Sequence, residues 1–151
     1  MEIKSIIENY NNYLNKEISV NGWINNARIQ TNIAFIALND GSCQSTLQIV
    51  IEFNEETSCS EKLQDLKSLS KGASISITGK IIESPGKGQP FEMKSELSQM
   101  IINGKVISNE YPLSKGKHSL EYIRQFPHLR VRTNTFGNAN FIIIVNCSGR
   151  Q

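Results

Sequence analysis

The chain has 151 residues, of which 38% are hydrophobic and 20% are charged, and this is the profile of one folded domain with a short appendage. The formal net charge is only +2, which argues against a protein that coats nucleic acid by bulk positive charge. Residues 1–104 carry nine Lys or Arg against twelve Asp or Glu, and residues 105–151 carry seven against two. If the first part binds RNA, it must do so through individually placed contacts.

Neither a membrane segment nor a metal site is expected. No apolar run approaches the roughly 20 residues that a membrane helix needs, and the first residues, MEIKSIIENYNN, lack the hydrophobic stretch of a secretory signal. We therefore expect no membrane partner and a cytoplasmic protein, with an organellar location left open. Cys43, Cys59 and Cys147 are widely spaced and have no His at ligand spacing, so neither a disulfide framework nor a zinc site is predicted.

Hydrophobic periodicity predicts a small barrel. Helical spacing indicates a short N-terminal helix at 5–14 and a second helix at 60–70, which Lys71-Gly72 ends. Alternation of apolar and polar residues predicts five strands, at 18–24, 33–38, 46–52, 74–81 and 91–97, the last continuing toward 101–102. Gly22 indicates a bulge or tight bend in the first strand, and we expect Trp23 beside it to pack.

Five strands with one helix between the third and fourth have the order of an all-β barrel of the OB type. An SH3-like barrel lacks that helix, and an α/β fold needs more helices. After Gly104 the sequence changes to a linker and the start of a junction over 105–137. Residues 106–117 are predicted to be extended, and one or two helical turns at 119–126 should stop at Pro127. Residues 138–151 form a separate tail with the aliphatic run FIIIV at 141–145, and we expect that tail to be weakly ordered.

The strand pattern also predicts which side chains face outward. In the second strand Ile36 and Leu38 fit the core face, so Phe35 should point out. By the same alternation Gln48 points out of the third strand, and Glu92 and Lys94 point out of the fifth. An exposed ring, amide and carboxylate on three strands of a small barrel are typical of a site for unstacked bases.

A second interpretation of the same pattern stays open. A register error of one residue would bury Phe35, and single exposed Phe, Gln or Glu residues are common on sheets. Arg28 follows the first predicted strand and is either a solvated loop charge or a contact to a phosphate or base.

Two longer stretches carry a family resemblance. VNGWINNAR (20–28) and IAFIALNDGSCQSTLQIVI (33–51) resemble the N-terminal anticodon-binding domain of class IIb aminoacyl-tRNA synthetases, which comprise aspartyl, asparaginyl and lysyl enzymes. Two further segments distinguish the three kinds of enzyme: ITGKIIESPGKGQPFEM (77–93) and YPLSKGKHSLEYIRQFPHLRVRTNTFG (111–137). The second segment is similar specifically to the asparaginyl enzymes. The likeness covers about residues 16–137.

The resemblance implies roles for four residues. Phe35 matches the aromatic residue on which the middle anticodon base stacks, and Gln48 matches the glutamine that reads its edge. Arg28 matches an arginine that helps to hold the anticodon, and Glu92 matches a glutamate beside it. The implied partner is the anticodon of asparagine tRNA. The implied activity of the full enzyme is ligation of asparagine to that tRNA with ATP and Mg²⁺.

The resemblance stops at residues 138–151, which stand where the family begins its motif 1 helix. Counterparts of motifs 2 and 3 are not found, so we expect this chain alone to bind nucleic acid without catalytic residues, cofactor or aminoacylation. Two alternatives stay open. One is a piece of a split synthetase that is active with a catalytic partner, and a homodimer is a further possible assembly of the chain. The other is a structural OB domain that does not bind tRNA.

Overall fold

The structure is a computed structural model that describes residues 1–53, 61–86, 88–107, 111–113, 118–133 and 135–137. The chain divides into two compact units, Met1–Ser108 and Asn109–Gln151. The second unit contains the short helices α4 (Leu120–Arg124) and α5 (Pro127–Arg130). Pro127 occupies the first turn of α5, so it starts a helix as well as following one. The predicted tail at 138–151 lies outside the described residues.

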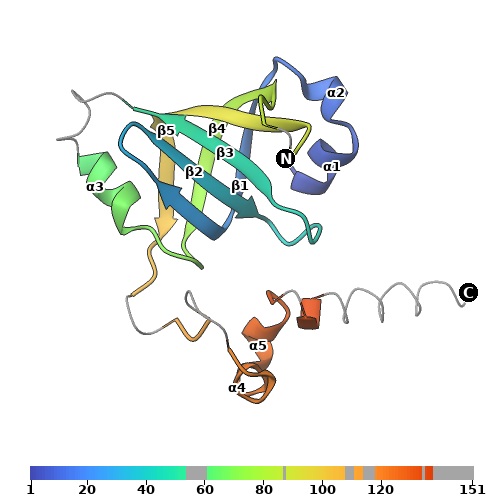
Figure 1. Ribbon diagram of the computed structural model, residues 1–151, viewed down its shortest axis with the longest axis vertical. Coiled ribbons are helices and arrows are strands. Elements are labelled where there is room, and N and C mark those ends of the chain that lie inside the picture. The colour runs from blue at the N-terminus through green and yellow to red at the C-terminus, as the bar shows by residue number, and fades with distance from the viewer. Residues whose placement is uncertain (54–60, 87, 108–110, 114–117, 134, 138–151) are drawn as a thin grey trace, which may run out of the picture. The chain divides into compact units, whose positions relative to one another are not determined.

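The first unit is a closed barrel of five strands in the order β1-β2-β3-β5-β4 (Figure 1). The strands are β1 (Glu17–Ile29), β2 (Ile33–Asn39), β3 (Leu47–Glu52), β4 (Ser74–Glu83) and β5 (Phe91–Gly104). Helix α3 (Glu61–Ser68) lies between β3 and β4 in the chain. Strands β3 and β5 pair in parallel and the other neighbours pair antiparallel. The predicted OB-type barrel is confirmed.

The barrel interior is filled by the aliphatic residues that alternation assigned to it. Ile49, Ile51 and Ile75 are completely buried, and Ile77 and Phe91 are almost so. Leu63 and Leu66 of α3 join the same core. Because a shift of one residue would turn all these side chains to the solvent, their burial fixes which residues of each strand face outward.

Strand β1 differs from its prediction. It continues to Ile29, and its bulge lies between Ile24 and Asn26 rather than at Gly22. Gly22 instead meets strand β2 closely, since a Cβ there would lie 2.8 Å from the carbonyl oxygen of Asn39. Trp23 points out of the barrel and is 41% exposed, so it does not belong to the core. Alternation explains this, because Val20, Gly22 and Ile24 take the inner face.

The N-terminal segment forms two short helices, α1 (Ile3–Glu8) and α2 (Tyr10–Tyr13), instead of one. Figure 1 shows them on the opposite side of the barrel from α3. Ile3 and Ile6 are fully buried in the common core. The Tyr10 ring stacks on Phe91, the first residue of β5, with centroids 5.0 Å apart. The N-terminal helices are therefore part of the barrel unit.

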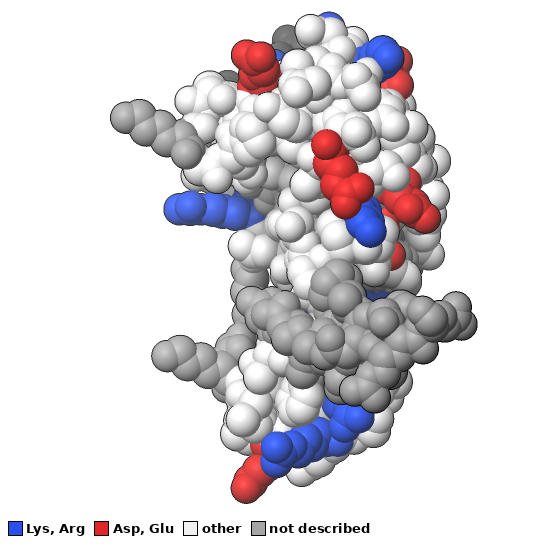
Figure 2. Space-filling view, turned by 90° about the vertical axis from the view of Figure 1, so that its right-hand side faces the viewer, with Lys and Arg blue, Asp and Glu red and all other residues white. Residues whose placement is uncertain are grey.

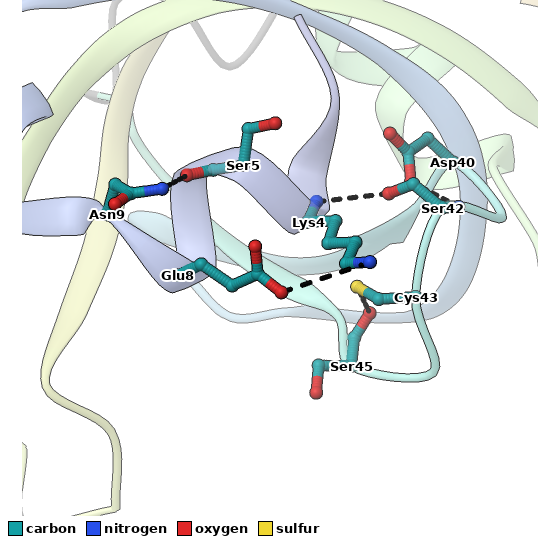
Figure 3. Close-up of polar contacts among 8 residues, drawn as sticks. All are labelled: Lys4, Ser5, Glu8, Asn9, Asp40, Ser42, Cys43 and Ser45. Atoms are coloured by element: carbon teal, nitrogen blue, oxygen red, sulfur yellow. Dashed lines mark hydrogen bonds and ion pairs between the residues drawn. The ribbon is translucent and has the colours of Figure 1, made fainter. Parts of the chain in front are cut away.

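The loop after β2 holds the first turn of α1 (Figure 3). The backbone N–H of Ile3 donates to Asp40 Oδ2 at 2.8 Å, and that of Lys4 donates to Ser42 Oγ at 3.0 Å. Ser42 in turn donates to Asp40 Oδ1 from its hydroxyl at 2.6 Å and from its N–H at 3.0 Å. These contacts satisfy backbone donors that a helix leaves free at its start.

The same contacts set the protonation of Asp40. Partial burial raises the pKa of this carboxyl, but the hydrogen bonds from Ser42 and Ile3 outweigh the burial and hold the pKa below its usual value. A carboxyl whose pKa is lowered on folding stabilises the fold in its ionised form. The contact between the loop and α1 is therefore strongest when Asp40 is charged.

We predict that Asp40→Ala lowers the free energy of unfolding by about 1 kcal/mol near neutral pH, since the first turn of α1 loses its acceptor. The stabilisation is present above the unfolded pKa of about 3.9 and is lost as the pH falls through the folded pKa. Urea unfolding of both proteins at pH 7 and in acid measures this. Asp65→Ala is the control, with a smaller loss, because the Asp65 side chain is 44% exposed and forms its ion pair with the exposed Lys105 side chain. An Asp40→Ala deficit that does not shrink in acid would contradict the assignment.

Candidate nucleic-acid interface

One row of outward side chains crosses four strands of the barrel. Arg28 of β1 pairs with Phe35 of β2, Phe35 pairs with Val50 of β3, and Val50 pairs with Lys94 of β5. The residues next to Phe35 and Val50 along their strands are buried in the core, so the row lies on the outer face. Arg28 is a strand residue directly across from Phe35 and does not follow the strand as predicted.

A second row lies beside the first. Ala37 of β2 pairs with Gln48 of β3. Ile49 of β3 pairs with Met93 of β5 in parallel. Gln48 and Glu92 are the residues immediately before this pair on their two strands, so they are neighbours across β3 and β5. The four residues predicted for the site therefore share the outer face of β1, β2, β3 and β5. The structure brings them together over two adjacent rows.

The two central side chains are less exposed than the sequence indicates. Phe35 and Gln48 are both half-buried, while Arg28 is exposed. Val50 points outward between Phe35 and Lys94 and yet is only 4% exposed, because cross-strand neighbours lie close enough to cover it. The Phe35 ring thus combines a packing role with an accessible part of its surface. It points outward as predicted, but it is less exposed than expected.

Glu92 is a buried carboxylate, with 8% of its surface exposed. Its Oε2 accepts a hydrogen bond from Ser84 Oγ at 3.1 Å, and Ser84 Oγ accepts one from the N–H of Gly86 at 3.2 Å. The turn between β4 and β5 therefore contacts the outer face at Glu92, and the predicted exposed carboxylate is not found. Sequence reasoning missed Ser84, because strand alternation does not show where a turn folds.

Charge on the face is balanced rather than strongly positive. Lys94 Nζ lies 2.8 Å from Glu52 Oε2, and both side chains are about half exposed. The pair lines an open hollow of about 910 Å³ that continues along β5 to Gln99. Figure 2 shows one side of the molecule, on which basic and acidic residues are interspersed on a mostly uncharged surface. Such a face selects a ligand through placed groups and not through a field of one sign.

The described residues form neither a metal-binding cluster nor a helix that could span a membrane. They contain no group of three or more His, Cys, Asp or Glu side chains that could hold a metal ion. Within the same residues, no helix is long and apolar enough to cross a membrane. Cys43 is a free, half-buried thiol in the loop after β2.

Comparison with known proteins places the barrel in a family. Residues 18–103 match the model of the "OB-fold nucleic acid binding domain". The chain belongs to this OB-fold family. It is 48% identical over 135 residues to the asparagine–tRNA ligase of Borrelia garinii, and 40% identical over 139 residues to that of Cytophaga hutchinsonii. These matches cover 89% and 90% of the chain but only 28% of each relative.

Solved structures agree with this assignment of the OB fold. The asparaginyl-tRNA synthetase of Entamoeba histolytica, in complex with asparaginyl-adenylate, matches with a TM-score of 0.62 and 25% identity over 80% of this chain and 28% of that one. The Pyrococcus horikoshii enzyme with asparaginyl-adenylate matches at a TM-score of 0.68 and 16% identity, over 88% of this chain and 29% of that one. The OB fold of this chain is thus also found within longer synthetases.

We predict that Ser84→Ala lowers the free energy of unfolding by about 1–2 kcal/mol, because the buried Glu92 carboxylate loses a donor. Ser98→Ala is a matched control, since Ser98 Oγ donates to Glu96 Oε2 at 3.2 Å where both residues are exposed. Ser98→Ala should alter the free energy of unfolding by no more than about 0.5 kcal/mol. Chemical denaturation of the three proteins measures the difference. Equal losses of stability from the two substitutions would show that the Ser84–Glu92 hydrogen bond stabilises the fold no more than an exposed hydrogen bond does.

Proposed function

We propose that the outer face of β1, β2, β3 and β5 binds the anticodon loop of a tRNA, and that the anticodon is that of asparagine. One observation carries the proposal: Phe35 and Gln48 lie in adjacent outward rows, with Arg28 directly across from the ring. Membership of the OB-fold family supports nucleic-acid binding. The relatives named as asparagine–tRNA ligases, up to 48% identical, support the choice of tRNA.

Each residue has a role that follows from its chemistry. The Phe35 ring gives an unstacked base a face on which to stack. The Gln48 amide both donates and accepts hydrogen bonds, so it can bind the edge of a base that lies over the neighbouring row. The exposed guanidinium of Arg28 can reach a phosphate or stack on the next base. Glu92 is acceptor-only when ionised, and the bond from Ser84 fixes its orientation.

The composition of the barrel fits recognition of an RNA loop better than coating of a strand. Residues 1–104 have more acidic than basic side chains, so bulk attraction to phosphate is weak. Sequence-specific binding of RNA uses splayed bases in loops, read by stacking and by hydrogen bonds. Ligation of asparagine is the named activity of relatives of which this chain spans 28%. For this chain we propose RNA binding. We assign the ligation, with its ATP and Mg²⁺, to a protein of the relatives' length.

We predict that Phe35→Ala weakens binding of an asparagine-anticodon stem-loop by about 1–3 kcal/mol, because the stacking surface is lost. Phe35→Tyr keeps the ring and should bind nearly as the unchanged protein does. Fluorescence anisotropy at one low salt concentration measures this. Ile101, 64% exposed on β5, provides the control substitution Ile101→Ala, with no expected change.

The same variants also test the fold. Phe35 is half-buried, so Phe35→Ala should lower the free energy of unfolding by roughly 1 kcal/mol, and circular dichroism should show an intact barrel. A folded Phe35→Ala protein that binds the stem-loop as tightly as the unchanged protein would overturn the proposed stacking role.

A further inference from the structure

We propose that Lys94 binds a phosphate of the RNA backbone beside the nucleotide that stacks on Phe35, and that Glu52 positions the Lys94 ammonium for this contact. The inference rests on the proposed anticodon binding and adds a backbone subsite to it. The ligand class is a nucleic-acid phosphodiester.

The position of Lys94 in the barrel supports this subsite. Lys94 stands in the same outward row as Arg28 and Phe35, separated from Phe35 by Val50 alone. Neighbouring strands are about 4.8 Å apart, so Lys94 starts roughly 10 Å from the ring across the sheet. One nucleotide with its flanking phosphate spans such a distance. The row therefore places a cation on each side of Phe35, with Arg28 adjacent to the ring and Lys94 two strands away.

The ion pair shows which way the Lys94 side chain extends. Lys94 has Val50 of β3 on one side and Lys80 of β4 on the other. Its ammonium meets Glu52 of β3, which lies two residues beyond Val50 and on the far side of that row from Gln48. The side chain thus leans toward β3 and along the sheet away from Gln48, into the hollow that Lys80 also lines. An ammonium has three donors, so the contact with Glu52 leaves donors for a phosphate.

The exposure of the pair allows a ligand to enter. Lys94 and Glu52 side chains are 48% and 56% exposed, and an ion pair of this exposure is weak and easily rearranged. Both residues line the open hollow beside β5, which leaves room for a phosphate and its water. Glu52 also offsets the charge of Lys94, which keeps the face from binding phosphate unselectively.

The barrel contains a matched ion pair elsewhere. Lys105 pairs with Asp65 of α3, and those side chains are 55% and 44% exposed. This pair lies outside the row of Arg28, Phe35 and Lys94, so it has the same chemistry without the proposed site. Removal of Lys105 therefore measures how much the loss of an exposed lysine outside the proposed site weakens RNA binding.

The experiment compares how RNA affinity depends on salt in variants that already lack the carboxylate of the ion pair. Removing the lysine from such a variant leaves no unpaired acidic side chain behind. The affinity for the asparagine-anticodon stem-loop is measured from low to moderate salt for Glu52→Gln and for Glu52→Gln/Lys94→Gln. The control compares Asp65→Asn with Asp65→Asn/Lys105→Gln. Loss of Lys94 should weaken binding on the order of tenfold at low salt. It should also make the slope of log K against log salt shallower by about 0.7.

The outcomes separate this inference from the proposed function. The control pair should show no change in slope. If loss of Lys94 matches loss of Lys105 while the unchanged protein binds the stem-loop, the phosphate subsite is wrong and anticodon binding stands. If the unchanged protein does not bind the stem-loop at any salt concentration, both proposals fail.

Discussion

The parallel pairing of β3 with β5 closes the barrel, and the site depends on that closure. It places Val50 beside Lys94, and the same register continued by one residue brings Gln48 next to Glu92. The pairing thereby joins β5 to a face that β1, β2 and β3 begin. The inward residues Ile49, Ile51 and Met93 have no exposed surface. Because successive residues of a strand point to opposite faces, the packed interior holds each outward side chain in its place. A slip of one residue would exchange core and site together.

Loops and helices outside the face support the residues that form it. The turn after β4 donates to the Glu92 carboxylate through Ser84. The Tyr10 ring of α2 stacks on Phe91, the neighbour of Glu92. Asp40 and Ser42 in turn hold the start of α1. The buried acceptor of the site is thus supported from two other parts of the barrel unit, which keeps a recognition group in one orientation.

Sequence patterns predicted the barrel and the outward sides of β2 and β3, because alternation of apolar residues determines both. They failed where the backbone departs from alternation. The bulge after Ile24 carries β1 on to Ile29, and so Arg28 lies opposite Phe35 within the sheet. Burial of Glu92 depends on a turn, and the reach of Lys94 to Glu52 depends on packing between strands that are distant in sequence. Roles for Phe35 and Gln48 came from family resemblance joined to alternation.

We propose that Gln48 and Phe35 together read the middle base of an anticodon. The most direct test measures the affinity of the unchanged protein and of Gln48→Ala for two stem-loops at one low salt concentration. One has the asparagine anticodon and the other has a changed middle base. We expect the unchanged protein to prefer the asparagine anticodon on the order of tenfold, since a mismatch leaves polar groups unpaired. Gln48→Ala should lose most of that preference. Equal binding of both stem-loops by the unchanged protein would contradict the proposed reading of the middle base.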